Sequence, residues 1–195
     1  MDKKQVTIGV LALQGAFLEH MDHLRELGAR PKKVRTPEDL DGLDGIILPG
    51  GESTAMRKGL DTYGLFDPLL KKISGGLPAW GTCAGLILLS SSITDDDTVH
   101  LALMDMETTR NAYGRQLGSF HHTAHLPFLG DAPYPMVFIR APYIRQTGPS
   151  VTPLVKVEGR LVAARQGHML ATAFHPELTD DLRFTRYFID MCLTQ

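Results

Sequence analysis

The first half of the chain alternates short apolar runs with segments of helical periodicity. The runs cover residues 6–13 and 44–51, and a third ends at Trp80. Between the first two runs, apolar residues recur at helical spacing before a C-capping glycine: Phe17, Leu18, Met21, Leu24, Leu27 and then Gly28. Helical patterns at 54–60 and 65–74 separate the second run from the third. This alternation is typical of βαβ units and a mainly parallel sheet.

The pattern changes at about residue 95, where short strand-like runs with Pro- and Gly-rich connections begin. A hairpin is predicted to turn at Glu158-Gly159, and a terminal helix is predicted within residues 180–193. We therefore expect an α/β fold in three layers. Its doubly wound sheet is mixed but mostly parallel, with helices on both faces, and residues 1–195 form one domain.

Composition narrows the class of protein. The chain has 195 residues, of which 43% are hydrophobic and 22% charged, enough for one well-filled core. Its formal charge of -2 lacks the positive excess expected of a protein that binds nucleic acid or an anionic membrane. The run at 6–13 contains Gly9 and lacks a small-residue cleavage site, so it is interpreted as a buried strand and not a signal peptide. We expect a cytoplasmic protein.

Two cysteines, Cys83 and Cys192, do not suggest a disulfide framework, and they differ in their surroundings. Cys83 stands in "GTCAG" (81–85), at a predicted turn from strand to helix. Small residues on both sides allow a sharp turn that exposes the thiol, and a helix N-terminus favours the thiolate. Taken alone, such a cysteine is more often structural than catalytic. Cys192 lacks these surroundings and is predicted to pack on the last helix.

Two further predicted strand ends carry groups that complement a reactive cysteine. The carboxyl ends of parallel strands share one edge of the sheet, so "PGGES" (49–53) and His175-Pro176-Glu177 can lie near Cys83. The amide of Ala84 and a glycine amide of the 50–51 loop are candidate oxyanion donors. His175 is the candidate proton carrier and Glu177 its orienting carboxylate. The sequence thus predicts a Cys-His-Glu triad.

Other polar clusters are less informative. The histidines His121, His122 and His125 suggest a metal site, but no cysteine or carboxylate completes a ligand set around them. A solvated strand is the favoured interpretation, and we expect no metal and no organic cofactor. The acidic residues 95–97 are interpreted as a solvated loop.

Six motifs together resemble a known family: "LALQGAF", "LPGGEST", "GTCAGLI", "RNAYGRQ", "FIRAP" and "ATAFHPELT". They are similar to the glutaminase subunits of pyridoxal 5'-phosphate synthase, which are class I, triad-type glutamine amidotransferases with a flavodoxin-like fold. The resemblance runs from residue 6 to about residue 187. "GTCAG" and "FHPE" are shared by the wider class, whereas "LQGAF", "PGGEST" and "RNAYGRQ" are specific to the subfamily.

The resemblance implies a reaction and a partner. Glutamine is hydrolysed to glutamate and ammonia through a γ-glutamyl thioester, and the ammonia passes to a (β/α)₈-barrel synthase subunit that makes pyridoxal 5'-phosphate. Cys83 is implied as the nucleophile, with His175 and Glu177 completing the triad. Glutamine-binding roles fall on Gly51, Glu52, Ser53, Arg110, Ile139 and Arg140. Gly51 and Ala84 correspond to the oxyanion hole, and Gln14 lies near it and near the partner interface.

Opposite charges are needed for the α-ammonium and α-carboxylate of glutamine. Glu52 is assigned to the ammonium and an arginine to the carboxylate, with the choice between Arg110 and Arg140 left open. Two other functions compete with this hypothesis. A stand-alone cysteine hydrolase of similar fold should lack the glutamine-binding glutamate and the His-Pro-Glu ending. A catalytically silent regulatory subunit should have lost one triad member.

Overall fold

A computed structural model describes residues 5–111 and 118–194 of the chain. Within these residues one sheet has ten strands. Its hydrogen-bonded order is β2 (Arg30–Val34), β1 (Thr7–Leu11), β3 (Gly45–Leu48), β4 (Ala79–Thr82), β12 (Met169–Thr172), β11 (Arg160–Gln166), β9 (Tyr143–Thr147), β6 (Met104–Thr109) and β5 (Ser90–Ile93). The tenth strand, β10 (Thr152–Val157), pairs with β11. A separate two-stranded sheet consists of β7 (Ser119–Ala124) and β8 (Tyr134–Ile139).

The sheet changes direction along its width, as the sequence predicts. Strands β2, β1, β3, β4 and β12 are parallel to one another. On the other side of β12, strand β11 runs antiparallel to β12, β10 and β9, and β9 runs antiparallel to β6. The predicted hairpin joins β10 to β11 through Glu158 and Gly159, whose φ angles of 50° and 77° suit a tight turn.

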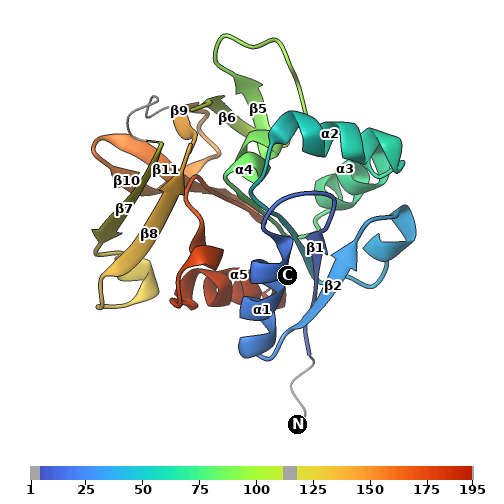
Figure 1. Cartoon of the computed structure of the whole chain (residues 1–195), viewed down its shortest axis with the longest axis horizontal. Helices are drawn as coiled ribbons and strands as arrows, with labels where there is room; N and C mark the ends of the chain where they lie inside the picture. Colours follow the sequence, from blue (N-terminus) through green and yellow to red (C-terminus); the bar gives the residue numbers. More distant parts are fainter. Residues whose placement is uncertain (1–4, 112–117, 195) are drawn as a thin grey trace.

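Helices cover both faces of the parallel half (Figure 1). Helices α1 (Phe17–Glu26) and α5 (Arg183–Leu193) lie on one face, and α2 (Ser53–Thr62), α3 (Phe66–Ser74) and α4 (Ala84–Leu89) on the other. Single 3₁₀ turns occur at Pro37–Leu40 (η1), Pro127–Leu129 (η2) and Pro176–Leu178 (η3). The predicted doubly wound, three-layer architecture is confirmed. In the described part of the chain, no helix combines the length and apolar character needed to cross a bilayer.

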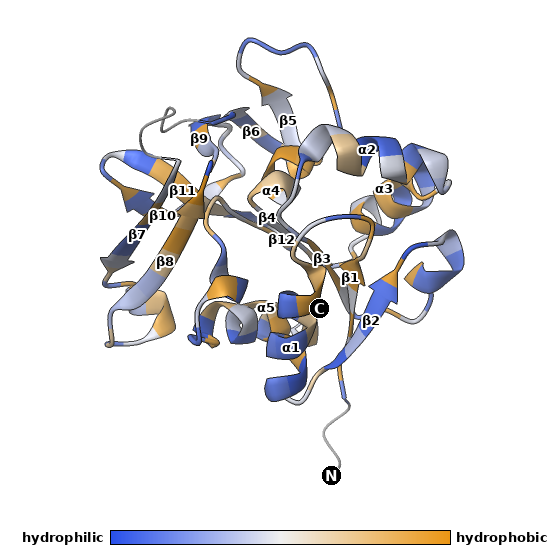
Figure 2. Cartoon of the chain, viewed as in Figure 1, coloured by the Kyte–Doolittle hydropathy of each residue, from blue (hydrophilic) through white to orange (hydrophobic). Residues whose placement is uncertain are grey.

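The central strands are apolar on both faces because helices cover both (Figure 2). Every residue of β3, β4 and β12 is buried. Between this sheet and α5 lies an aromatic cluster, in which Trp80 stacks on Phe184 with ring centroids 6.2 Å apart and Phe174 meets Phe184 edge to face at 5.3 Å. These rings fill the core between α5 and strands β4 and β12, and close packing of interior side chains makes this part of the core rigid.

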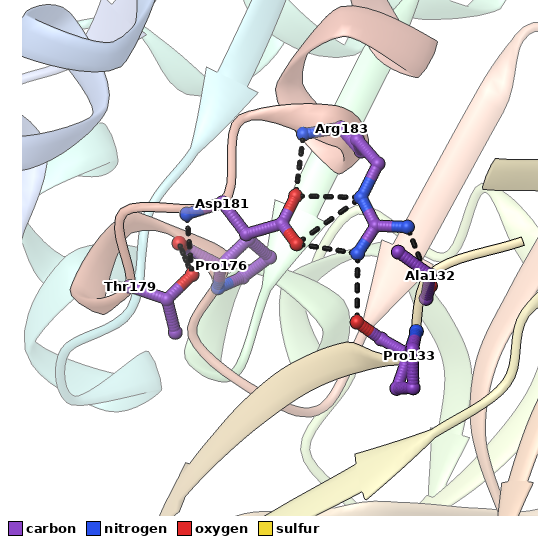
Figure 3. Close-up of polar contacts among 6 residues, drawn as sticks. All are labelled: Ala132, Pro133, Pro176, Thr179, Asp181 and Arg183. Atoms are coloured by element: carbon purple, nitrogen blue, oxygen red, sulfur yellow. Dashed lines mark hydrogen bonds and ion pairs between the residues drawn. The ribbon is translucent and has the colours of Figure 1, made fainter. Parts of the chain in front are cut away.

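Arg183 ties the segment after β12 to the β7–β8 sheet (Figure 3). Its guanidinium donates to both carboxylate oxygens of Asp181, over 2.6–3.1 Å. The same group donates to the carbonyls of Ala132 and Pro133, at 2.6 and 2.8 Å. Asp181 in turn receives support from Thr179, whose hydroxyl accepts the Asp181 N–H. This network anchors the backbone that follows His175 and Glu177.

The turn at Cys83 depends on close contact between backbones. A Cβ atom added to Gly85 would overlap the carbonyl group of Leu48 in β3, and one added to Gly81 would overlap the backbone of Gly85. Only glycine therefore lets α4 start so close to β3 and β4.

Gly85→Ala is expected to lower the free energy of unfolding by about 1–3 kcal/mol or more, because the new methyl group displaces the Leu48 backbone. Gly118→Ala is the matched control: no atom of the described residues lies within 4 Å of an added Cβ there, and the change should stay within about 0.5 kcal/mol. Urea unfolding measures both. Equal stability of Gly85→Ala and wild type would contradict the assigned packing.

Candidate active site

Three loops meet at the carboxyl edge of the parallel strands. Strand β4 lies between β3 and β12 and is parallel to both, so the segments that follow these strands emerge side by side. They open on a pocket of about 380 Å³, a size suited to a small metabolite. Of the residues assigned to the glutamine site from the sequence, all but Glu177 line this pocket: Gln14, Gly51, Glu52, Ser53, Cys83, Ala84, Arg110, Ile139, Arg140 and His175.

Cys83 sits on a strained turn between β4 and α4. Its φ of 50° and ψ of -103° are unusual for a residue with a side chain, and its N–H donates to the Thr172 carbonyl of β12 at 2.8 Å. The side chain is 7% exposed and lines the pocket. Its Sγ lies 3.9 Å from the Ile139 carbonyl oxygen. The turn has the geometry of a nucleophile elbow.

Gly50 allows the thiol and the imidazole to approach one another. A Cβ atom added to Gly50 would strike the His175 ring and lie 3.5 Å from the Cys83 Cβ. The loop after β3 thus packs directly against both groups, and a larger residue at 50 would push His175 away.

His175 and Glu177 form a buried pair beside Cys83. The carboxylate can only accept, so His175 Nδ1–H donates to Glu177 Oε1, at 2.7 Å. This bond leaves Nε2 available to Cys83, whose side chain is among the influences that raise the pKa of His175. The His175 N–H donates to the Val137 carbonyl of β8 at 2.8 Å, which fixes the backbone of the pair.

The surroundings favour the charged forms of both groups. Burial alone lowers the pKa of His175, but the contacts with Cys83 and Glu177 outweigh it and raise the pKa to about 10. Burial raises the pKa of Glu177, yet the histidines His20 and His175 lower it overall. Cys192, by contrast, lies buried on α5 as predicted, and burial raises the pKa of its thiol to about 12. Cys83 is therefore the cysteine with an acid–base partner.

Gln14 holds the glycine loop that faces the thiol. Its Oε1 accepts the Glu52 N–H at 2.9 Å, and its amide packs against the Cα of Gly51. Ala84 is the first residue of α4, where N–H groups lack partners within the helix. Gly51 and Ala84 thus both line the pocket together with Cys83.

Glu52 also has a structural role that was not predicted from the sequence. Its carboxylate caps α2, accepting the N–H groups of Thr54 and Ala55 at 3.0 and 2.7 Å. Burial raises the pKa of Glu52, but these bonds and the nearby Arg110 lower it overall, so the group stays ionised in the pocket wall. Ser53, the first residue of α2, is buried beside it.

Arg110 is held at the pocket by polar partners. Its guanidinium lies 3.0 Å from an Asp96 carboxylate oxygen and 3.4 Å from His100 Nε2. The interpretation of residues 95–97 as merely solvated is incomplete, because Asp96 orients a pocket residue. Arg140, which follows β8 with a φ of 43°, is exposed and also lines the pocket. Of the motif "RNAYGRQ", residues 112–116 lie outside the described part of the chain.

His20 was not singled out in the sequence. It is fully buried, and its Nε2 lies 3.4 Å from Oε2 of Glu177, the carboxylate oxygen that does not bind His175. Its signal was present: His20 lies three residues after Phe17 and four before Leu24, so it falls on the apolar face of its helix. A polar residue on such a face needs a partner. His121, His122 and His125 lie on or next to β7, and no cluster of at least three potential metal-binding side chains occurs in residues 5–111 and 118–194.

The architecture is shared with solved structures. One, described as "Crystal structure of glutamine amidotransferase", superposes with a TM-score of 0.89 at 43% sequence identity, over 95% of this chain and 98% of that one. The curved, mostly parallel sheet and its helices thus define a glutamine amidotransferase fold of the class I type.

Sequence comparisons identify the family. The model of the SNO glutamine amidotransferase family matches residues 10–194, and the chain belongs to this family. Proteins named "Pyridoxal 5'-phosphate synthase subunit PdxT" are similar over nearly their whole length. That of Roseiflexus sp. is 53% identical, over 95% of this chain and 100% of its own. That of Carboxydothermus hydrogenoformans is 51% identical, over 94% and 96%.

The His175–Glu177 pair predicts a pH-dependent stability. A pKa raised from 6.5 to about 10 stabilises the folded state fully below about pH 6.5, and this contribution is lost as the pH rises through 10. The difference in free energy of unfolding between wild type and His175→Gln should therefore shrink from about pH 6 to about pH 10. Urea unfolding at both pH values measures it; a difference that grew with pH would contradict the assigned ion pair.

Proposed function

We propose that this chain hydrolyses L-glutamine to L-glutamate and ammonia, and delivers the ammonia to a synthase subunit that makes pyridoxal 5'-phosphate. The single observation that carries the chemistry is the meeting of Cys83, His175 and Glu177 at adjacent strand ends, with the 2.7 Å bond between the last two. Membership of a glutamine amidotransferase family supports the substrate, and the names of the relatives support the synthase.

In the proposed acylation, the Cys83 thiolate attacks the side-chain carbonyl carbon of glutamine. The C=O bond opens to an oxyanion, which the N–H groups of Gly51 and Ala84 stabilise. Collapse of this intermediate breaks the C–N bond, and the His175 imidazolium gives its proton to the departing nitrogen. Ammonia and a γ-glutamyl thioester result.

Deacylation uses the same groups in reverse. Neutral His175 takes a proton from water, and the resulting hydroxide attacks the thioester carbonyl. The C–S bond breaks, Cys83 returns as thiolate, and glutamate leaves. Glu177 keeps Nδ1 of His175 protonated and stabilises the imidazolium in both halves of the cycle. These steps need neither a metal nor an organic cofactor.

The pocket wall suits the two charges on the α-carbon of glutamine. Because the ammonium and the carboxylate share one carbon, their partners must be close together, and Glu52 and Arg110 interact electrostatically. We assign the ammonium to Glu52 and the carboxylate to Arg110, which Asp96 holds in place. Ser53, Ile139 and Arg140 complete the glutamine subsite.

Ammonia released into water becomes ammonium, which is not nucleophilic, so direct transfer to a partner is chemically favoured. We infer a hetero-oligomer with a (β/α)₈-barrel synthase in the cytoplasm, with Gln14 at the pocket mouth as a contact that responds to docking. Glu52 and the complete Cys83–His175–Glu177 set argue against a stand-alone cysteine hydrolase and against a silent subunit.

Cys83→Ala should lower glutamine-dependent release of glutamate and ammonia by roughly 10⁴-fold or more, since no other group can form the thioester. The assay uses the chain with its cognate synthase and, in parallel, without it. Cys192→Ala, which removes the other cysteine, is the matched control and should retain wild-type rates. Full activity of Cys83→Ala would refute the mechanism. Equal rates with and without synthase would refute only dependence on the partner.

A further inference from the structure

His20 lies directly behind the carboxylate of Glu177. It is 0% exposed and lies on α1, which is distant in sequence from the segments that carry Cys83, His175 and Glu177. Its Nε2 is 3.4 Å from Glu177 Oε2 and 3.2 Å from the Thr82 hydroxyl. The Trp80 ring meets the imidazole edge to face, with centroids 5.5 Å apart. The ring is therefore held with one nitrogen aimed at the triad.

Glu177 needs a donor on this side. Its Oε1 accepts from His175, whereas Oε2 is buried and has no hydrogen-bond partner among the described residues. An unpaired carboxylate oxygen in the interior is costly. His20 Nε2 is at ion-pair distance from it.

The surroundings determine which form His20 takes. Burial lowers the pKa of His20, and the neighbouring His23 and His175 lower it further, against the opposing effects of Glu177 and Glu19. The imidazole is therefore neutral and carries one N–H. Nδ1 has no partner in the described part of the chain, and a buried N–H without an acceptor is rarer than an unused acceptor. The hydrogen consequently belongs on Nε2, facing Glu177 and Thr82.

We propose that His20 is a positioning residue: its polar Nε2–H, which lies between the Thr82 hydroxyl and Oε2 of Glu177, stabilises the charge on that oxygen and so orients the carboxylate whose other oxygen holds His175. The role rests on the proposed function only in its kinetic consequence, because the contact exists in the protein without glutamine. Through His20, helix α1 contacts both Thr82 at the end of β4 and Glu177 after β12. A purely space-filling His20 would leave the protonation of Glu177 and His175 unchanged.

A pair of amide variants separates the two roles. The side-chain nitrogen of His20→Gln can reach the position of the imidazole Nε2, whereas that of His20→Asn is one methylene too short. In the complex with synthase, His20→Asn should lower kcat about 10–100-fold at a KM within about twofold of wild type. Loss of the donor raises the pKa of Glu177, so the acid limb of the kcat profile should move to higher pH. His20→Gln should restore both.

His23→Asn is the control, because His23 is buried on the same helix but its Nδ1 contacts Thr185 at 3.4 Å. It should keep wild-type kcat and pH profile. Equal impairment of His20→Gln and His20→Asn, or an unchanged pH profile in His20→Asn, would overturn the proposal. If His20→Asn does not fold, His20→Leu takes its place with the same expectations.

A measurement without substrate tests the positioning role of His20 independently of whether the chain hydrolyses glutamine. The proton between His175 Nδ1 and Glu177 should give a downfield NMR signal, since it lies in a short, buried bond to a carboxylate. This signal should shift or broaden in His20→Asn and remain in His20→Gln and His23→Asn. An identical signal in His20→Asn would overturn the positioning role even if the chain hydrolyses glutamine. Absence of hydrolysis in wild type would refute the function and leave this contact testable.

Discussion

Parallel pairing of β4 with β3 and with β12 is the constraint on which the site depends. It places the carboxyl ends of three strands side by side, although the segments that follow them are distant in sequence. Close backbone contact then sets the spacing: Gly85 packs on Leu48, and Gly50 packs on the His175 ring. A cysteine, its acid–base partner and the glycine amides thus converge without any long side chain having to reach across the pocket.

Side chains outside the proposed triad hold the surroundings of the pocket in place. The Arg183–Asp181 pair anchors the segment after Glu177 to the loop before β8 (Figure 3). Gln14 fixes the glycine loop through the Glu52 N–H, and Asp96 holds Arg110. The proposed catalytic groups are therefore already oriented in the protein, which reduces the ordering that substrate binding must supply.

Much of this was predictable because local patterns encode it. Alternating apolar runs predicted the doubly wound sheet, and "GTCAG", "PGGES" and "HPE" marked the strand ends that meet. Contacts between side chains distant in sequence were not predictable. The pairing of Asp96 with Arg110 depends on how a loop folds back, and the contact of His20 with Glu177 depends on how α1 crosses the sheet. Neither contact corresponds to a fixed spacing between residues in the sequence. The position of His20 on an apolar helix face did indicate that it needs a polar partner.

The central claim is that Cys83 is the nucleophile of a glutamine-hydrolysing site, and covalent trapping tests it most directly. The chain in complex with its synthase is treated with a glutamine-like electrophile, and the modified residue is located by mass spectrometry. The account predicts one adduct per chain, on Cys83, formed more slowly when glutamine is present, with the buried Cys192 unmodified. Modification of Cys192 alone, or an unmodified Cys83 in a complex that hydrolyses glutamine, would contradict it.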